Sequence, residues 1–212
     1  MKRFTVIPLL LGFLTASPVG ANLLINTGFE DPITIDGPPF VGFWEGFSGG
    51  AGSLAGNSTL MPRSGAQSLG LSIDNTVDTF AGVFQDVPGL ISGTQYTFGG
   101  WHATPSSPLD LGVEIRIEWR NSVSNIEISR TPNLTPVPTA AYFPFNLTAA
   151  VPDGADTGRV VYAVQSFSTN PLGNGTVLVD DVSFDVIPEP STALLLAIGA
   201  LGLAGMRRKR AA

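Results

Sequence analysis

The sequence predicts an all-β fold for residues 22–186, an antiparallel jelly-roll β-sandwich. Glycine and proline number 25 and 17 among 212 residues and recur at short intervals along the chain. No long segment keeps the 3.6-residue hydrophobic period of an amphipathic helix. About ten short extended segments, separated by such turns, are typical of two packed sheets.

The clearest strand lies at residues 113–120, where apolar residues alternate with Glu and Arg. Successive side chains of a strand point to opposite faces, so one face of this strand is apolar and the other is charged. We expect the charged face to be solvated and stabilised by cross-strand ion pairs. A ligand-binding face is the alternative.

Eight further segments have the composition and alternation of strands. They are expected at residues 23–26, 68–73, 81–87, 95–102, 125–129, 142–147, 160–166 and 176–185. Residues 34–40 and 131–139 are rich in proline and are expected to form loops.

Residues 1–21 have the features of a secretory signal peptide and are expected to form an N-terminal signal helix. Lys2 and Arg3 give a positive start, residues 4–14 are mostly apolar, and Val19 and Ala21 are small residues where signal peptidase requires them. We expect signal peptidase to cut after Ala21, which places the body outside the cytoplasm. An uncleaved N-terminal anchor is the alternative.

Residues 187–212 form a tail of three parts: the rigid motif Pro188-Glu189-Pro190, an uncharged apolar run at 192–206, and a terminal basic cluster. The cluster consists of Arg207, Arg208, Lys209 and Arg210. The apolar run is near the lower limit of roughly 17 residues for a single transmembrane helix. The basic cluster stops transfer and predicts a cytoplasmic C-terminus. A buried core helix is the alternative, but such a helix would be amphipathic.

This order of motif, apolar helix and basic cluster resembles the PEP-CTERM sorting signal of Gram-negative bacteria. The resemblance implies export, transient anchoring in the inner membrane and recognition by an exosortase, a transpeptidase-like membrane enzyme. It also implies a final location at the cell surface or in the extracellular biofilm matrix, in association with polysaccharide.

The composition of the body excludes several functions. Five arginines stand against sixteen acidic residues, a formal charge of about −11, and there is no lysine or cysteine. Without a basic patch we expect no binding to nucleic acid, and without cysteine there is no disulfide or thiolate site. Triad and phosphate-loop motifs are absent, His102 is a lone strand histidine, and no spacing singles out a glycosidase pair among the carboxylates. We therefore expect a protein that is not an enzyme.

Three stretches of the body resemble the galactose-binding-like jelly rolls found in carbohydrate-binding modules. They are an opening strand at 22–30, a central hairpin at 81–98 and a closing strand at 177–184. The resemblance implies that the first and last strands meet beside a structural calcium ion, with Glu30 and Asp180 as ligands.

The residues themselves leave a second reading of Asp180 open. By alternation its carboxylate points to the same side as Leu178, Val182 and Phe184. A bare carboxylate is costly there, so it needs either a cation or a set of backbone N–H donors.

Two functions remain open for the body. In the first, it binds extracellular polysaccharide, with Trp44, Trp101 and Tyr142 as candidate stacking platforms; the alternative for the tryptophans is a place in the core. In the second, the body is a structural or adhesive matrix protein without a specific sugar site.

The two ends together hold all the lysines of the chain and are interpreted as processing signals. We expect the mature surface protein to begin at Asn22 and to lack the basic cluster at 207–210. Mass spectrometry of the protein from the cell surface checks both ends. An intact basic C-terminus on that protein would mean that the tail is a simple membrane anchor.

Overall fold

The computed structural model describes residues 21–38, 40, 44–167, 172–187 and 198–199. The predicted signal peptide, the Pro-Glu-Pro motif, the predicted transmembrane helix and the basic cluster lie outside these residues, apart from residues 21 and 198–199. Within the described segments, no helix has the length and apolar character needed to cross a bilayer.

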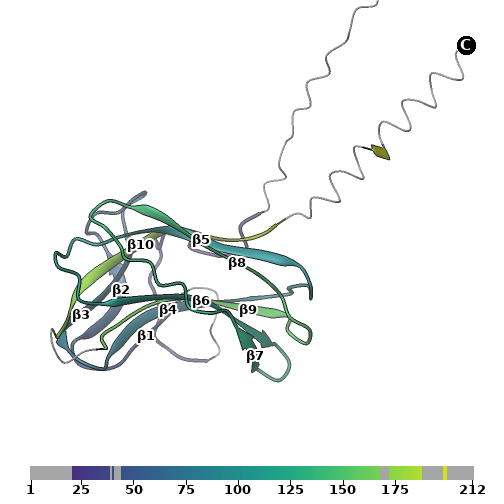
Figure 1. The fold of residues 1–212 in the computed structure, drawn as a ribbon, viewed down its shortest axis with the longest axis horizontal. Helices are drawn as coiled ribbons and strands as arrows, with labels where there is room; N and C mark the ends of the chain where they lie inside the picture. The colour runs from purple at the N-terminus through teal and green to yellow at the C-terminus, as the bar shows by residue number, and fades with distance from the viewer. Residues whose placement is uncertain (1–20, 39, 41–43, 168–171, 188–197, 200–212) are drawn as a thin grey trace, which may run out of the picture.

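In the described residues, ten strands form two antiparallel sheets that pack face to face (Figure 1). Sheet A has the order β1 (Glu45–Ser48), β4 (Phe80–Pro88), β9 (Thr157–Gln165), β6 (Gly112–Asn121) and β7 (Ile126–Arg130). Sheet B has the order β2 (Ser53–Ser58), β3 (Ser68–Thr76), β10 (Gly173–Val186), β5 (Gln95–Ala103) and β8 (Phe143–Ala150). The predicted all-β sandwich is confirmed.

The core lies between the sheets, and alternation along the strands builds it, most clearly in β6. In β6 the side chains of Val113, Ile115, Ile117 and Trp119 are all at most 3% exposed. Burying one such side chain contributes about 1.5–3 kcal/mol. This strand therefore fixes which face of sheet A is exposed to solvent, because a one-residue slip in its pairing register would turn its apolar side chains outward.

The opening segment differs from the prediction. Residues 23–26 form no strand, although Leu23 donates a backbone hydrogen bond to the carbonyl of Phe184 (3.0 Å). Next to it, the Asn22 side chain donates to the carbonyl of Val182 and accepts from the N–H of Phe184, both at 3.0 Å. The chain then turns with a φ of 54° at Asn26, which ends any extended pairing.

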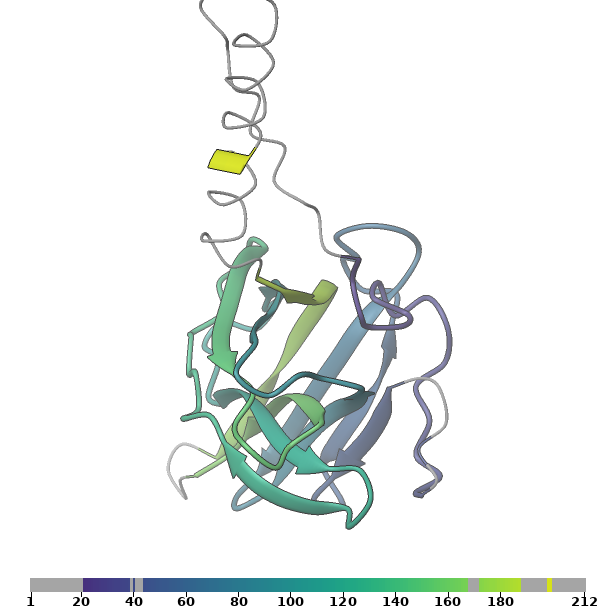
Figure 2. The same cartoon turned by 90° about the vertical axis from the view of Figure 1, so that its right-hand side faces the viewer.

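The opening segment and the end of β10 thus lie together, as the resemblance implied. They are joined by isolated backbone hydrogen bonds and the Asn22 side-chain amide rather than by a continuous ladder. The described residues at the two ends of the sandwich domain consequently emerge from the same end of the sandwich (Figures 1 and 2). Two strands, β1 and β2, were not predicted, because their segments are short and rich in glycine and serine.

A β-bulge in β10 changes which residues face the core. The pairing with β5 passes from Asp180 opposite Trp101 directly to Ser183 opposite Gly99, and Asp181 has a φ of 47°. The extra residue shifts the alternation by one position. Val179 before the bulge and Val182 after it both point into the core. The prediction that Asp180 and Val182 share a face is therefore wrong.

One polar contact crosses the core between the sheets. His102 of β5 is fully buried, and its Nδ1 lies 2.6 Å from the hydroxyl of Tyr162 of β9. Its ring packs on Phe143 and Phe145 at centroid distances of 4.3 and 5.4 Å, and its Nε2 has no partner among the described residues. Burial therefore lowers the pKa of His102 from 6.5 to about 4.

This buried histidine predicts a loss of stability in mild acid. The unfolded chain takes up a proton below pH 6.5, whereas folded His102 stays neutral until about pH 4. Stability should thus fall as the pH drops, by about 2 kcal/mol between pH 7.5 and pH 5 from this group. Urea unfolding at both pH values, with His102→Phe as the comparison, measures it. Equal pH dependence in both proteins would contradict the assignment.

Candidate functional site

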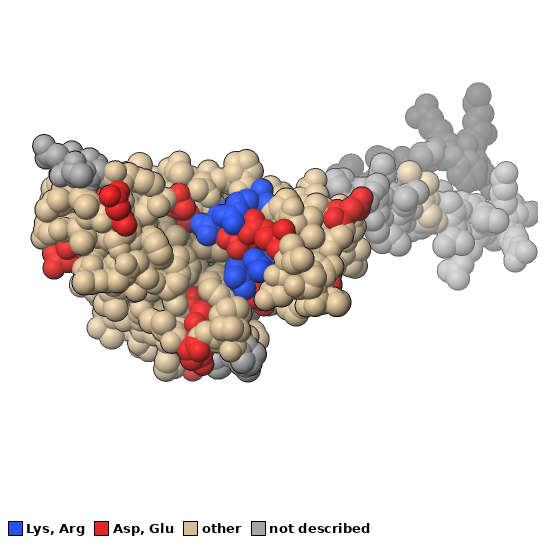
Figure 3. Space-filling model, turned by 90° about the horizontal axis from the view of Figure 1, so that it is seen from below, with Lys and Arg blue, Asp and Glu red and all other residues tan. Residues whose placement is uncertain are grey.

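The outer face of sheet A carries most of the positive charge of the body. Four of its five arginines point out from β6, β7 and β9 onto this face, each within 4 Å of a carboxylate. They are Arg116, Arg120, Arg130 and Arg159. Figure 3, which views the molecule from below, shows this mixed charged cluster beside a depression in an uncharged surface.

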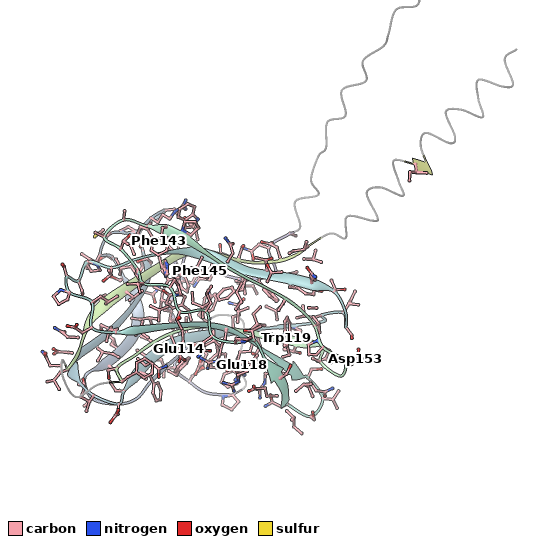
Figure 4. All side chains as sticks on the ribbon, in the orientation of Figure 1. Glu114, Glu118, Trp119, Phe143, Phe145 and Asp153 are labelled. Atoms are coloured by element: carbon pink, nitrogen blue, oxygen red, sulfur yellow. The ribbon has the colours of Figure 1, made fainter. Side chains whose placement is uncertain are left out.

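Glu118 is the centre of this cluster and is only 6% exposed. Its carboxylate lies 2.9 Å from Arg116 Nε, 3.7 Å from Arg120 Nη1 and 3.8 Å from Arg130 Nη1. Figure 4 shows Glu118 and Glu114 on the lower of the two sheets. The predicted cross-strand pairs are present between β6 and β7, but the expectation of a solvated face is wrong for Glu118. The charges hold one another in fixed positions.

Two further ion pairs extend the cluster. Arg159 binds Asp86 through two parallel hydrogen bonds of 2.7 and 2.8 Å, which is the strong bidentate geometry. Arg130 binds Glu127 in the same way at 2.6 and 2.7 Å, and this hydrogen bonding lowers the pKa of Glu127. The lowered pKa keeps Glu127 ionised at neutral pH.

Four phenylalanine rings line the same face beside the charged cluster, and we call them the phenylalanine row. Phe80, Phe47, Phe84 and Phe40 follow one another with centroid distances of 6.0, 6.3 and 4.9 Å. Phe80 is 44% exposed. The guanidinium of Arg159 lies 3.9 Å above the Phe84 ring, so the row and the charged cluster touch.

Away from the contact between Arg159 and Phe84, the small residues Gly82 and Ala163 separate the phenylalanine row from the charged cluster. Phe47, Gly82, Ala163 and Glu114 face one another across four neighbouring strands. A Cβ atom on Gly82 would lie 2.4 Å from the Phe47 ring and 2.9 Å from Ala163. Only glycine therefore lets the Phe47 ring lie flat over β4. The result is an aromatic surface beside fixed hydrogen-bonding groups.

The structure places the predicted sugar-binding residues differently. Trp44 is fully buried, packs on Phe29 at 5.1 Å and donates its Nε1–H to the carbonyl of Asn26 (3.1 Å). The prediction of Trp44 as a stacking platform is therefore wrong. Its neighbour Phe47, in the same segment, is the ring that reaches the outer face of sheet A.

Trp101 and Tyr142 lie away from the phenylalanine row. Trp101 is on the outer side of sheet B opposite Asp180, and the Arg63 guanidinium covers its ring at 3.9 Å. Burial raises the pKa of Tyr142, and the nearby Asp180 adds to this rise. Sugar binding by these two residues stays a prediction.

Asp180 is fully buried under the loop that precedes β3. Its Oδ2 accepts the backbone N–H groups of Arg63 (2.8 Å) and Ser64 (3.1 Å), and its Oδ1 accepts that of Asp181 (2.8 Å). Burial raises the pKa of Asp180, and these three hydrogen bonds oppose the rise. The carboxylate thus has the set of backbone donors that was the alternative to a cation.

Glu30 holds the other side of the same loop. Its Oε1 accepts the backbone N–H groups of Ala66 (2.9 Å) and Gln67 (3.2 Å). In the described part of the chain, no group of three or more histidine or carboxylate side chains is placed to hold a metal ion. Glu30 and Asp180 both bind the backbone of the loop before β3, and we call the two carboxylates the loop clamp. Their contacts fit this role better than a calcium site, and calcium binding stays a prediction.

Comparison with protein families identifies the tail. Residues 186–209 match the family model of the PEP-CTERM protein-sorting motif, which confirms the resemblance seen at the C-terminus. No curated protein matches the sequence.

Solved structures share the fold of the body. The enzymatically active domain of tailspike protein 4 from bacteriophage CBA120 aligns with a TM-score of 0.60 and 17% identity over 78% of this chain, which spans 21% of the tailspike chain. The CBM22-1 xylan-binding domain of Xyn10C from Paenibacillus barcinonensis aligns with a TM-score of 0.53 and 14% identity, over 80% of this chain and 97% of that domain. A CBM4 structure aligns with a TM-score of 0.51 and 18% identity, over 77% and 99%. At these identities the comparisons show the jelly-roll fold of carbohydrate-binding modules.

The loop clamp predicts how stability depends on its two carboxylates. Asp180→Ala removes the acceptor of three buried N–H groups and should cost about 2–4 kcal/mol, whereas Glu30→Gln keeps an acceptor oxygen and should cost less than about 1 kcal/mol. Since backbone donors satisfy Asp180, EDTA at matched ionic strength should leave the melting temperature unchanged. A chelator-dependent drop in melting temperature would instead restore the calcium prediction.

Proposed function

We propose that the body binds an extracellular polysaccharide on the outer face of sheet A, without catalysing a reaction. The observation that carries this proposal is the phenylalanine row lying against a cluster of fixed arginine and carboxylate groups on one open sheet face. The fold shared with carbohydrate-binding modules supports it.

The chemistry of this face suits sugars. A sugar ring offers apolar C–H groups to an aromatic surface and hydroxyl groups to donors and acceptors at its edge. Arginines and carboxylates held by one another lose little side-chain freedom when they bind such hydroxyls, which favours affinity. A row of several rings, rather than one, fits an extended chain.

We further propose that an exosortase sorts the protein to the cell surface after signal peptidase has acted, with the inner membrane as a transient anchor. The sorting motif at 186–209 supports this route. Directly after β10, the N–H of Ile187 donates a hydrogen bond to the carbonyl of Gln95 at the start of β5 (2.9 Å), and this bond continues the pairing of the two strands. A cut within the Pro-Glu-Pro motif would therefore remove no pairing of β10.

A structural or adhesive matrix protein without a sugar site is the second candidate. One observation favours it: each arginine on the outer face of sheet A already has a carboxylate partner. The cluster could then serve to hold the strands together. Binding experiments separate the two candidates.

Phe84→Ala tests the proposed site, because it removes the ring that contacts both the phenylalanine row and Arg159. Losing a central aromatic anchor should weaken binding at least about tenfold. Affinity electrophoresis in gels containing xylan, a soluble β-glucan or the exopolysaccharide of the producing strain measures the change.

Trp101→Ala is the matched control, since it removes an aromatic ring from the outer side of sheet B. It should leave polysaccharide binding unchanged, and thermal melting should show that both variants are folded. Loss of binding in Trp101→Ala alone would move the site to sheet B. If the wild-type protein binds none of the polysaccharides, the structural candidate is favoured.

A further inference from the structure

A pocket of about 290 Å³ opens where β9 ends and β10 begins. Its lining includes Leu109, Asp110, Gly112, Gln165 and Phe167. Small-ligand pockets start at about 300 Å³, so this one has room for a single sugar ring rather than a chain.

Phe167 gives this pocket an exposed aromatic wall. The residue is 66% exposed, and its ring rests directly on Gly112, where a Cβ atom would lie 2.4 Å from Cε2. A large exposed ring that rests on a glycine offers an apolar surface to solvent. A well-packed core phenylalanine would not have this exposure.

Two polar side chains face the same space. The Gln165 amide is held by a hydrogen bond to Glu114, and Asp110 is the one charged residue among the described residues that line the pocket. The N–H of Asp110 bonds to the carbonyl of Asn174 (3.0 Å), which ties this segment to the start of β10. The pocket therefore combines an aromatic wall with one amide and one carboxylate.

The pocket continues the phenylalanine row. Phe80, Gln165 and Gly112 are paired across β4, β9 and β6. Phe80 is also the last ring of the row, 6.0 Å from Phe47. A glycan chain lying on the row would thus reach the pocket with its end.

We propose that this pocket binds the terminal monosaccharide of a neutral glycan whose chain lies on the phenylalanine row. The inference rests on the proposed polysaccharide binding and adds the kind of ligand: a chain end without a carboxylate. The Asp110 carboxylate can accept hydrogen bonds from sugar hydroxyls, but it repels a uronic acid at the same position.

The position of the pocket suits a protein anchored by its tail. β10 starts beside the pocket at Gly173 and ends at Val186, next to the sorting motif. At about 3.3 Å per residue, its 14 residues span roughly 45 Å. The pocket therefore lies at the end of the domain opposite the anchor and is accessible before and after processing.

Ligand-observed NMR on the mature protein tests the proposal with four free sugars: glucose, galactose, mannose and glucuronate. The wild type should bind at least one neutral sugar, with a dissociation constant on the order of millimolar, and should not bind glucuronate. Phe167→Ala should weaken binding of the neutral sugar at least about tenfold, and Asp110→Asn should admit glucuronate.

Ile91→Ala is the matched control, because Ile91 is 67% exposed and lies outside the pocket lining; it should bind as the wild type does. Unchanged binding in Phe167→Ala, or no binding of any neutral sugar by the wild type, overturns the proposal. Polysaccharide binding that survives such a result leaves the proposed function standing. Conversely, Phe84→Ala should weaken polysaccharide binding and keep the monosaccharide signal, which separates the two claims.

Discussion

The closing strand β10 is the constraint on which much of this structure depends. It lies in the middle of sheet B, where its first half pairs with β3 and its second half with β5. Its bulge follows Asp180 and turns Val182 and Phe184 into the core. Asp180 itself points outward under the loop before β3, where its carboxylate binds the backbone of residues 63 and 64. Its far end is capped by the Asn22 side chain. Since β10 is also the last strand in the sequence, sheet B is complete only when the chain has been made almost to the sorting tail.

The distribution of charge separates the two faces of the sandwich. Most of the arginines of a body with a formal charge of about −11 are gathered on the outer face of sheet A. That face is close to neutral, while the rest of the surface is acidic and keeps the protein soluble. A neutral glycan can approach the face without the electrostatic repulsion that a polyanion would meet from the acidic surface around it.

Much of the fold follows from local sequence patterns, since alternation in segments such as 113–120 fixes both the strand and its buried face. The bulge could not be foreseen, because nothing in the run Val-Asp-Asp-Val marks the residue that leaves the ladder. Two of the three backbone donors to Asp180 come from a loop more than a hundred positions away. Leu23 looked like part of a strand, but it makes only one backbone hydrogen bond to β10, and the Asn22 side chain supplies two more.

The candidate site was only partly visible in the sequence. The alternating Glu and Arg of β6 were evident, but their burial depends on β7 and β9. The segment around Trp44 was recognised, yet the indole is in the core and Phe47 is the ring that faces out. The phenylalanine row joins segments before β1, in β1 and in β4, so it exists only once the strands are paired.

We propose that the glycan binds on the outer face of sheet A. Titration of the ¹⁵N-labelled mature protein with an oligosaccharide that it binds, followed by amide chemical shifts, tests this most directly. Binding on this face should concentrate the shifts in β4, β6 and β9, with Phe84, Glu114 and Gln165 among the residues most affected. Shifts concentrated around Trp101 and Tyr142 on sheet B would contradict it.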